Sequence, residues 1–386
     1  MDTVLQDKSY VASTYGRAPL IAVSGKGAVI KGENGREYID LGSGIAVNTF
    51  GVCDEPWIAA VEEQLHSLQH LSNLYYTRPQ AALAQLLCEK TGMEKVFFSN
   101  SGAEANECAI KTARKYSSDK YGGGRSCIIT LENSFHGRTM ATLSATGQPA
   151  MHQSFAPFLE GFKYAPANDF NAMKSLCDGS VCAIMMELVQ GEGGVNPLDR
   201  DYVRQAAELC RENDLLLIID EVQTGNGRTG SLYAFMQYSI TPDIVTTAKG
   251  LAGGLPLGAT LLGSKTAATL TPGSHGSTFG GNPVCAAGAI SILSRLDEKL
   301  FAEVREKSAY IFSSLSGAVG VKSVTGLGLM IGIETERPAG ELAARCLAKG
   351  IIVLTAKSKI RLLPPLNIET AQLEKAIEIL KGVLAS

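Results

Sequence analysis

The sequence lacks an excess of charge, a long apolar run and any sign of export. Among its 386 residues, 35 Lys and Arg stand against 38 Asp and Glu, a net charge of -3, which gives no broad basic surface for nucleic acid. No basic start leads into an apolar stretch, and no run approaches the roughly 18 apolar residues of a membrane span. We therefore expect neither a nucleic-acid partner nor a membrane partner.

Paired cysteines are also missing. The nine cysteines are an odd number, are scattered along the chain and include no CxxC pair, which argues against a disulfide framework and against a zinc site. Most of them lie in apolar stretches, where cysteine usually serves as a small buried side chain. We expect a cytoplasmic protein with reduced thiols and no metal centre.

What the sequence does contain is a large supply of apolar residues in short runs. Hydrophobic residues make up 45% of the chain, enough at this length for a large core and roughly two to three domains. Continuous apolar runs, with helical patterns such as 103–116 and 201–212 between them, lie at residues 95–99, 127–131, 181–187, 215–220, 243–247 and 259–263. Such runs are typical of parallel strands that are buried on both faces.

These patterns predict an α/β fold with a large and a small domain. We place the large domain, a mostly parallel sheet covered by helices, at residues 49–285. A smaller α+β domain at 286–386 mixes helices and strands around a Gly-rich middle. Residues 1–48 alternate short strands with turns, and we expect this N-terminal segment to pack with the small domain.

The stretch FSNSGAEANE, at residues 98–107, passes from a strand into a helix. Ser101, Gly102 and Ala103 stand at the junction, where free backbone N–H groups and the helix dipole favour an anion. This arrangement predicts a phosphate seat. Ser and Asn are also the usual helix caps, so an ordinary N-cap is the alternative.

Two further residues suggest a cofactor. Asp220 ends the apolar run LLLIID, and ligands of parallel sheets bind beyond the carboxyl ends of the strands. Lys249 follows another apolar strand and precedes GLAGG, where glycines let the backbone come close to a ligand. A carboxylate for a pyridine nitrogen and a lysine for a Schiff base are what pyridoxal phosphate needs. The alternatives are that Asp220 caps a turn and that Lys249 is a solvated surface charge.

The loop SFHGRT, at residues 134–139, offers Phe135 to stack on a planar ring and Arg138 to bind a carboxylate. We assign no role to His136, because a histidine without a carboxylate partner in view is more often structural. GNGRTG, at 225–230, matches the dinucleotide fingerprint GxGxxG. Four residues separate it from the preceding strand and no clear helix opens at its last glycine, so we do not expect a dehydrogenase.

With these residues in place, the sequence resembles the class III aminotransferases over nearly its whole length. Six motifs follow the order and spacing of that family: FSNSGAEANE, SFHGRT, ELVQGEGGVNP, IIDEVQTGNGRTG, TTAKGLAGGLPLGA and GSHGSTFGGNP. The resemblance implies fold type I of the pyridoxal-phosphate-dependent transferases and a homodimer whose active sites draw on both subunits. Within the family, the likeness is greatest to the enzymes that act on N-acetylornithine.

The resemblance also implies roles around the cofactor. It assigns Gly102 and Ala103 to the phosphate, Phe135 and Val222 to the two faces of the ring, Asp220 to the ring nitrogen, Gln223 to the phenolic oxygen, Lys249 to the Schiff base, and Thr278, donated by the partner subunit, to the phosphate, with Ser277 beside it near the substrate. For Ser277 and Thr278 the alternative is a plain turn before the next helix.

The resemblance gives the substrates two arginines. Arg138 would bind the carboxylate of N-acetylornithine or the distal carboxylate of glutamate, and Arg361 would bind the α-carboxylate of glutamate. Glu192 would mask Arg361 when the substrate brings an amine without a carboxylate beside it. Tyr15 is a further candidate on the substrate side.

The expected reaction is the reversible, two-step transfer of the δ-amino group of N-acetylornithine to 2-oxoglutarate. It gives N-acetylglutamate semialdehyde and glutamate, as in arginine biosynthesis, with Lys249 moving the proton as general base and acid. Gly44 stands where ornithine-specific relatives carry a tyrosine, which leaves room for an acylated substrate. The alternatives are another ω-aminotransferase, for ornithine, succinylornithine or 4-aminobutyrate, and, more distantly, a non-catalytic regulator built on the same fold.

Overall fold

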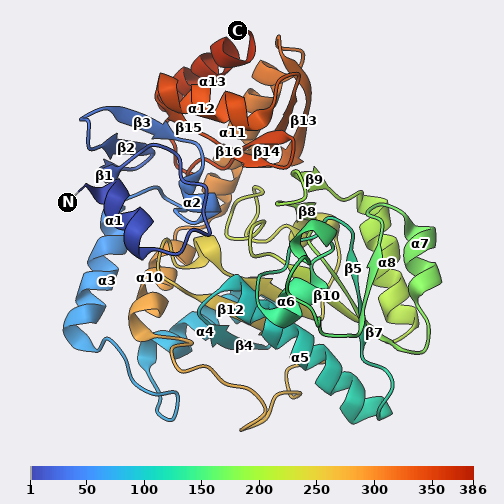
Figure 1. Cartoon of the computed structure of the whole chain (residues 1–386). Coiled ribbons are helices and arrows are strands. Elements are labelled where there is room, and N and C mark those ends of the chain that lie inside the picture. The colour runs from blue at the N-terminus through green and yellow to red at the C-terminus, as the bar shows by residue number, and fades with distance from the viewer. Residues whose placement is uncertain (1) are drawn as a thin grey trace.

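The computed structural model describes residues 2–386, which form a larger body with a smaller one above it (Figure 1). The α-helices are α1 (Thr3–Tyr10), α2 (Ser43–Ala46), α3 (Glu55–Ser67), α4 (Arg78–Thr91), α5 (Gly102–Tyr121), α6 (Met140–Ala145), α7 (Phe170–Leu176), α8 (Arg200–Glu212), α9 (Phe235–Tyr238), α10 (Pro283–Leu293), α11 (Glu298–Leu315), α12 (Ala339–Lys349) and α13 (Thr370–Leu384). The strands are β1 (Ala22–Lys26), β2 (Val29–Gly32), β3 (Glu37–Asp40), β4 (Lys95–Ser99), β5 (Cys127–Leu131), β6 (Phe162–Ala165), β7 (Val181–Met186), β8 (Val189–Gln190), β9 (Asn196–Pro197), β10 (Leu216–Asp220), β11 (Ile244–Thr247), β12 (Gly258–Leu262), β13 (Val321–Leu327), β14 (Met330–Thr335), β15 (Ile351–Ile352), β16 (Leu354–Ala356) and β17 (Lys359–Leu362).

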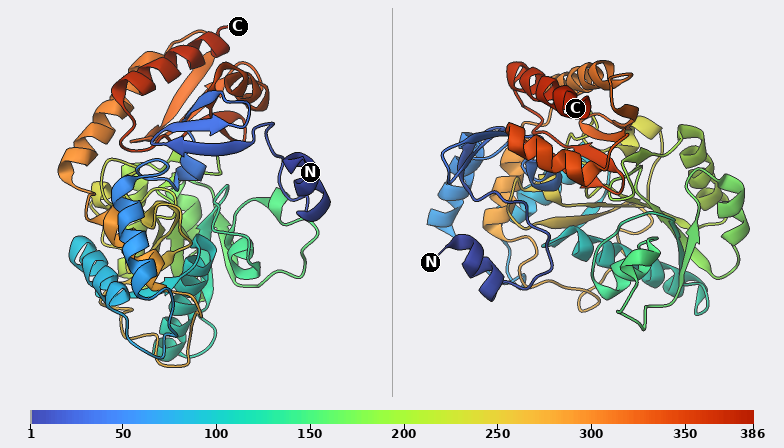
Figure 2. Two further views of the ribbon diagram at one scale, coloured as in Figure 1. Left: turned by 90° about the vertical axis from the view of Figure 1, so that its left-hand side faces the viewer. Right: turned by 45° about the horizontal axis from the view of Figure 1, so that its top comes forward.

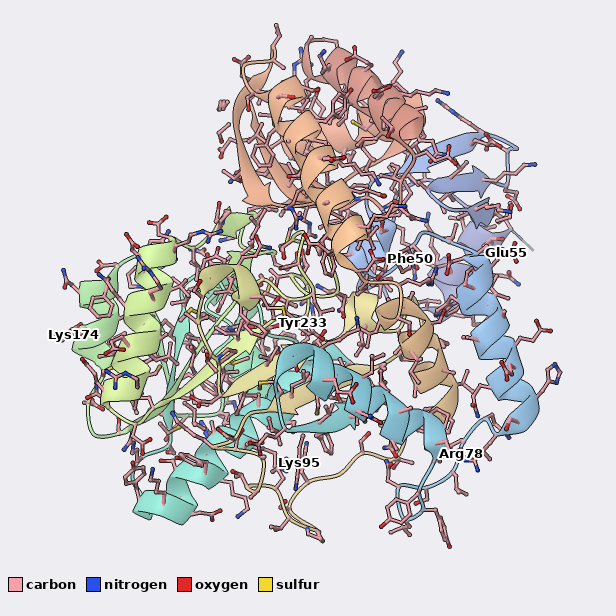
Figure 3. All side chains as sticks on the ribbon, turned by 180° about the vertical axis from the view of Figure 1, so that it is seen from behind. Phe50, Glu55, Arg78, Lys95, Lys174 and Tyr233 are labelled. Carbon is pink, nitrogen blue, oxygen red and sulfur yellow. The ribbon has the colours of Figure 1, made fainter. Side chains whose placement is uncertain are left out.

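A seven-stranded sheet forms the centre of the larger body. Its order is β4-β12-β11-β10-β7-β5-β6, and only β12 runs antiparallel to its neighbours. Every residue of β7, β10, β11 and β12 is buried, as continuous apolar runs require of strands covered on both faces. Seen from behind, Tyr233 lies near the middle of this body, and it is fully buried (Figure 3). The predicted α/β fold with a mostly parallel sheet is confirmed.

The smaller body joins the two ends of the chain. Its sheets have the orders β1-β2-β3-β15 and β13-β14-β17-β16, and β15 pairs in parallel with β3. This pairing supports the expectation that the N-terminal segment packs with the C-terminal part. The helix α10 packs against α3 and α4. The domain limits at residues 48 and 285 stay a prediction.

The parallel strands place several loops at one edge of the large sheet. The loops or helices that follow β4, β5, β7, β10 and β11 begin at that edge, because parallel strands share their carboxyl ends. The smaller body lies above the sheet in both views of Figure 2. No helix within residues 2–386 combines the length and the apolar character that crossing a bilayer demands.

Candidate active site

A cavity of about 580 Å³ opens where these loops meet. Nine of the residues predicted from the sequence line it: Ser101, Gly102, Ala103, Phe135, Arg138, Asp220, Val222, Gln223 and Lys249. They come from loops and helix ends after β4, β5, β10 and β11. The fold therefore gathers side chains that are up to about 150 residues apart in the sequence, as the strand topology demands.

The amino end of α5 forms one wall of the cavity. Ser101 is the N-cap of this helix, since its Oγ accepts a hydrogen bond from the N–H of Glu104 at 3.2 Å. A side chain on Gly102 would bring a Cβ within 2.6 Å of Val222 Cγ1, so only glycine fits here. The N–H groups of a first helical turn have no partner within the helix. Ser101 is therefore a helix cap, and the phosphate-binding role of this helix end stays a prediction.

Three hydrogen bonds hold the side chain of Asp220 in the cavity. Its Oδ2 accepts hydrogen bonds from Asn106 Nδ2 at 2.7 Å and from His136 Nδ1 at 2.8 Å, and its Oδ1 accepts from the N–H of Val222 at 3.0 Å. An ionised carboxylate only accepts hydrogen bonds, so the His136 proton sits on Nδ1. Three donors thus keep Asp220 in one orientation.

His136 and Asn106 belong to this site, although the sequence interpretation left both out. His136 was set aside because no carboxylate partner was in view; its partner is Asp220, 84 residues further along the chain. Asn106 is also tied to the backbone oxygen of His136 at 2.8 Å and to Thr246 at 2.7 Å. The only signal in the sequence was their position inside the motifs FSNSGAEANE and SFHGRT.

Lys249 has an unusual backbone and an unusual environment. Its φ of 45° lies in the left-handed region, which few residues other than glycine adopt and which is often found at functional sites. Burial lowers the pKa of the Lys249 amine, and the nearby charge of Glu192 opposes this effect. A buried amine with a lowered pKa is more readily neutral and nucleophilic.

Two buried carboxyl groups lie next to Asp220 in the fold. Burial raises the pKa of Glu187 to about 7, and burial likewise raises the pKa of Glu221 to about 7. Glu187 lines the cavity. Glu221 accepts a hydrogen bond from the N–H of Phe235 at 2.8 Å and another from Thr224 Oγ1. The sequence interpretation gave neither acid a role.

Glu192 and Arg361 form an ion pair beside the cavity. Arg361 Nη1 lies 2.6 Å from Glu192 Oε1, and the same guanidinium donates to Gln223 Oε1 at 3.1 Å. Burial tends to raise the pKa of Glu192, but the charge and hydrogen bonds of Arg361 bring it below its usual range. The predicted pair is thus closed in this structure, and Gln223 links it to the cavity wall.

The remaining predicted residues lie nearer the surface. Arg138 is exposed, with its guanidinium carbon 5.7 Å from the centre of the Phe135 ring. Ser277 Oγ accepts from Asn100 Nδ2 at 3.2 Å, whereas Thr278 is exposed and is not part of the cavity wall of its own chain. Tyr15 is 73% exposed. The single chain therefore does not bring Thr278 or Tyr15 into the cavity.

These residues fit pyridoxal phosphate. The cavity offers a helix amino end for a phosphate, the carboxylate of Asp220 for a protonated ring nitrogen, and the amine of Lys249 for an aldehyde. Phe135 and Val222 both line it, so a flat ring has an aromatic and an aliphatic neighbour. Because Gly102 has no side chain, Val222 packs directly against the amino end of α5.

Comparison with known proteins gives one consistent family. Residues 10–384 match the model of the family Aminotransferase class-III. Acetylornithine aminotransferase of Haemophilus ducreyi is 51% identical over 382 residues, 98% of this chain and 97% of the relative. The enzyme of the same name from Aquifex aeolicus is 45% identical, over 97% of this chain and all of the relative (100%).

Solved structures agree with this result. The ornithine aminotransferase of Toxoplasma gondii superimposes with a TM-score of 0.95 at 31% identity, covering 99% of this chain and 94% of that one. The N-acetylornithine aminotransferase of Stenotrophomonas maltophilia gives a TM-score of 0.86 at 34% identity, with coverage of 99% and 98%. The cavity, its lysine and aspartate, and a match that spans nearly the whole sequence all agree, and the chain therefore belongs to the class III aminotransferases, which depend on pyridoxal phosphate.

Proposed function

We propose that this enzyme transfers the δ-amino group of N-acetylornithine to 2-oxoglutarate, giving N-acetylglutamate semialdehyde and glutamate, a step of arginine biosynthesis. The observation that carries the proposal is the identity of 51% over 98% of the chain with a relative named for this reaction. The cavity supports it, because the Glu192–Arg361 pair gives one site two ways to receive a substrate. The reaction is reversible, and the two substrates use the site in turn.

In this proposal the buried polar residues carry distinct tasks. Bound pyridoxal phosphate supplies an aldehyde for amines and a ring that withdraws electrons from the reacting carbon. The carboxylate of Asp220, fixed by Asn106 and His136, keeps the ring nitrogen protonated. The amine of Lys249 holds the cofactor and, once displaced, carries a proton at Nζ between substrate and cofactor.

Substrate binding in this proposal depends on the two arginines. Arg138, at the exposed rim, binds the carboxylate at the far end of either substrate. Arg361 stays paired with Glu192 while an amine without a neighbouring carboxylate reacts, and it binds the α-carboxylate when glutamate enters. Gly44, whose added Cβ would meet no atom closer than 3.6 Å, leaves room on the substrate side.

We also propose a cytoplasmic homodimer with shared active sites. Large apolar side chains are exposed around the segment before α4 and the turn before α10: Leu71, Leu74, Tyr75, Tyr76 and Phe279. Exposed apolar patches of this kind favour association, and the adjacent Thr278 is exposed, so a second copy can contact it. The nine cysteines are free thiols, as expected for a reducing compartment.

An absorbance spectrum of the purified protein tests this function. We expect a yellow band from the bound cofactor, its loss on adding N-acetylornithine, its return with 2-oxoglutarate, and no such cycle in Lys249→Ala. A parallel panel of ornithine, succinylornithine and 4-aminobutyrate separates the related aminotransferases; ornithine is included because of the TM-score of 0.95 with an ornithine enzyme. If another amine changes the absorbance band more readily than N-acetylornithine does, that amine is the substrate. If no amine changes the band of cofactor-supplied protein, the protein is a regulator and not an aminotransferase.

A further inference from the structure

Two loops that serve different parts of the proposed reaction meet at one buried acid. The loop at residues 132–139, after β5, carries Phe135 in the cavity wall, where the proposed function places the cofactor ring. The turn at 191–195 carries Glu192, which forms the ion pair with Arg361. Glu187 follows β7 directly and lies between them, with only 5% of its surface exposed and its side chain in the cavity wall.

The two oxygens of Glu187 bind one loop each. Its Oε2 accepts a hydrogen bond from the N–H of Phe135 at 2.9 Å, and its Oε1 accepts from the N–H of Gly191 at 3.2 Å. Glu187 makes no ion pair with any residue in the range 2–386. Burying an acid without a cation is costly, and its chain neighbours Met186 and Leu188 are apolar. The role of this carboxylate is therefore to accept these two hydrogen bonds and not to fill apolar space.

Two further contacts hold the same loops together. Gln190 Nε2 donates to the backbone oxygen of Glu132 at 2.8 Å. A Cβ added to Gly193 would lie 2.5 Å from the backbone oxygen of Asn133, so the two backbones touch where glycine allows it. The loops consequently behave as one unit, and Glu187 is the part of that unit that faces the cavity.

We propose that Glu187 is a positioning residue that fixes the ring-stacking Phe135 and the Glu192 turn relative to each other. The proposal rests on the proposed function, since that function gives Phe135 and Glu192 their roles. Both oxygens of Glu187 accept backbone N–H groups of these loops, so the acid acts through the position of the loops. Its loss should therefore disturb the cofactor environment and the choice between substrates at the same time.

The test is Glu187→Gln, with Glu132→Gln as a matched control on the same loop, where the side chain is exposed. A glutamine offers one acceptor oxygen and turns an NH₂ group toward the second N–H. In the holoenzyme we expect a changed circular dichroism of the cofactor band and half-reaction rates reduced about tenfold to 100-fold. The preference between N-acetylornithine and glutamate should shift, and Glu132→Gln should match the wild type.

Two results would overturn the proposal. One is Glu187→Gln with a normal cofactor signal and normal half-reactions, but a lower melting temperature, since the acid would then only stabilise the fold. If Glu187→Gln does not fold, Glu187→Asp replaces it: the shorter side chain reaches only one of the two N–H groups, so unchanged readouts would equally refute the role. If the wild-type protein binds no cofactor, or if no amine changes its cofactor absorbance band, the proposed function itself is refuted.

Discussion

Replacing Glu192 by glutamine tests the substrate switch directly. Glu192 Oε1 lies 2.6 Å from Arg361 Nη1, and the side chains are 26% and 3% exposed. Glutamine keeps the shape of the side chain and its contact with Gln223, at 3.4 Å in the wild type, but it removes the charge. Arg361 then has no anionic partner until a substrate supplies one.

The expected size of the effect follows from the broken pair. A hydrogen bond to a charged group contributes about 1.5–3 kcal/mol, which corresponds to roughly 10- to 150-fold in an equilibrium constant. Glutamate and 2-oxoglutarate must displace Glu192 from Arg361 and so bind more tightly to Glu192→Gln. N-acetylornithine brings no carboxylate to Arg361, so in Glu192→Gln the buried guanidinium stays without an anionic partner. The kcat/KM for N-acetylornithine should therefore fall.

Single-turnover absorbance measurements of each half-reaction give the two effects separately. We expect the ratio of kcat/KM for glutamate to that for N-acetylornithine to rise at least about tenfold. Glu212→Gln, an exposed acid on α8, serves as the control and should leave the ratio unchanged. If kcat/KM changes equally in both half-reactions of Glu192→Gln, the switch is refuted, because the switch requires the two values to change in opposite directions.

Three further variants test other parts of the structure. Asp220→Asn cannot pair as an anion with a ring nitrogen, so both half-reactions should slow by roughly 100-fold or more; near-normal single turnovers would exclude its role. Glu221→Gln tests a buried acid whose folded-state pKa, about 7, lies above its ordinary value of 4.5. The neutral form is favoured in the folded state, so Glu221 should make wild-type stability fall as the pH rises from 4.5 to 7, by up to roughly 3 kcal/mol. Denaturant unfolding should show a smaller fall in the variant, in which only Glu187, whose pKa is also raised to about 7, still contributes. Leu74→Glu with Tyr76→Glu places charge on exposed apolar residues; sedimentation should then show weaker self-association, and an unchanged dimer would locate the interface elsewhere.

The apolar runs of the sequence determined most of the large sheet. The runs at residues 95–99 and 127–131 coincide with β4 and β5, because a strand buried on both faces needs uninterrupted apolar residues. The strand β6 and the helix α1 were not predicted: β6 is short and only partly buried, and no residue of α1 is buried. Residues that bury little surface leave a weak hydrophobic pattern.

The same reasoning located the ends of the strands, and with them Asp220, Lys249 and Gly102, since each lies at the end of an apolar run or within three residues of it. Sequence could not determine what those side chains touch. The bond between His136 and Asp220 joins residues 84 positions apart, and Glu187 joins two loops that only the order of β5, β7 and β10 in the sheet makes adjacent. Strand-forming patterns are local properties of a chain, whereas hydrogen-bond partners and burial depend on which strands become neighbours, and only the tertiary structure decides that.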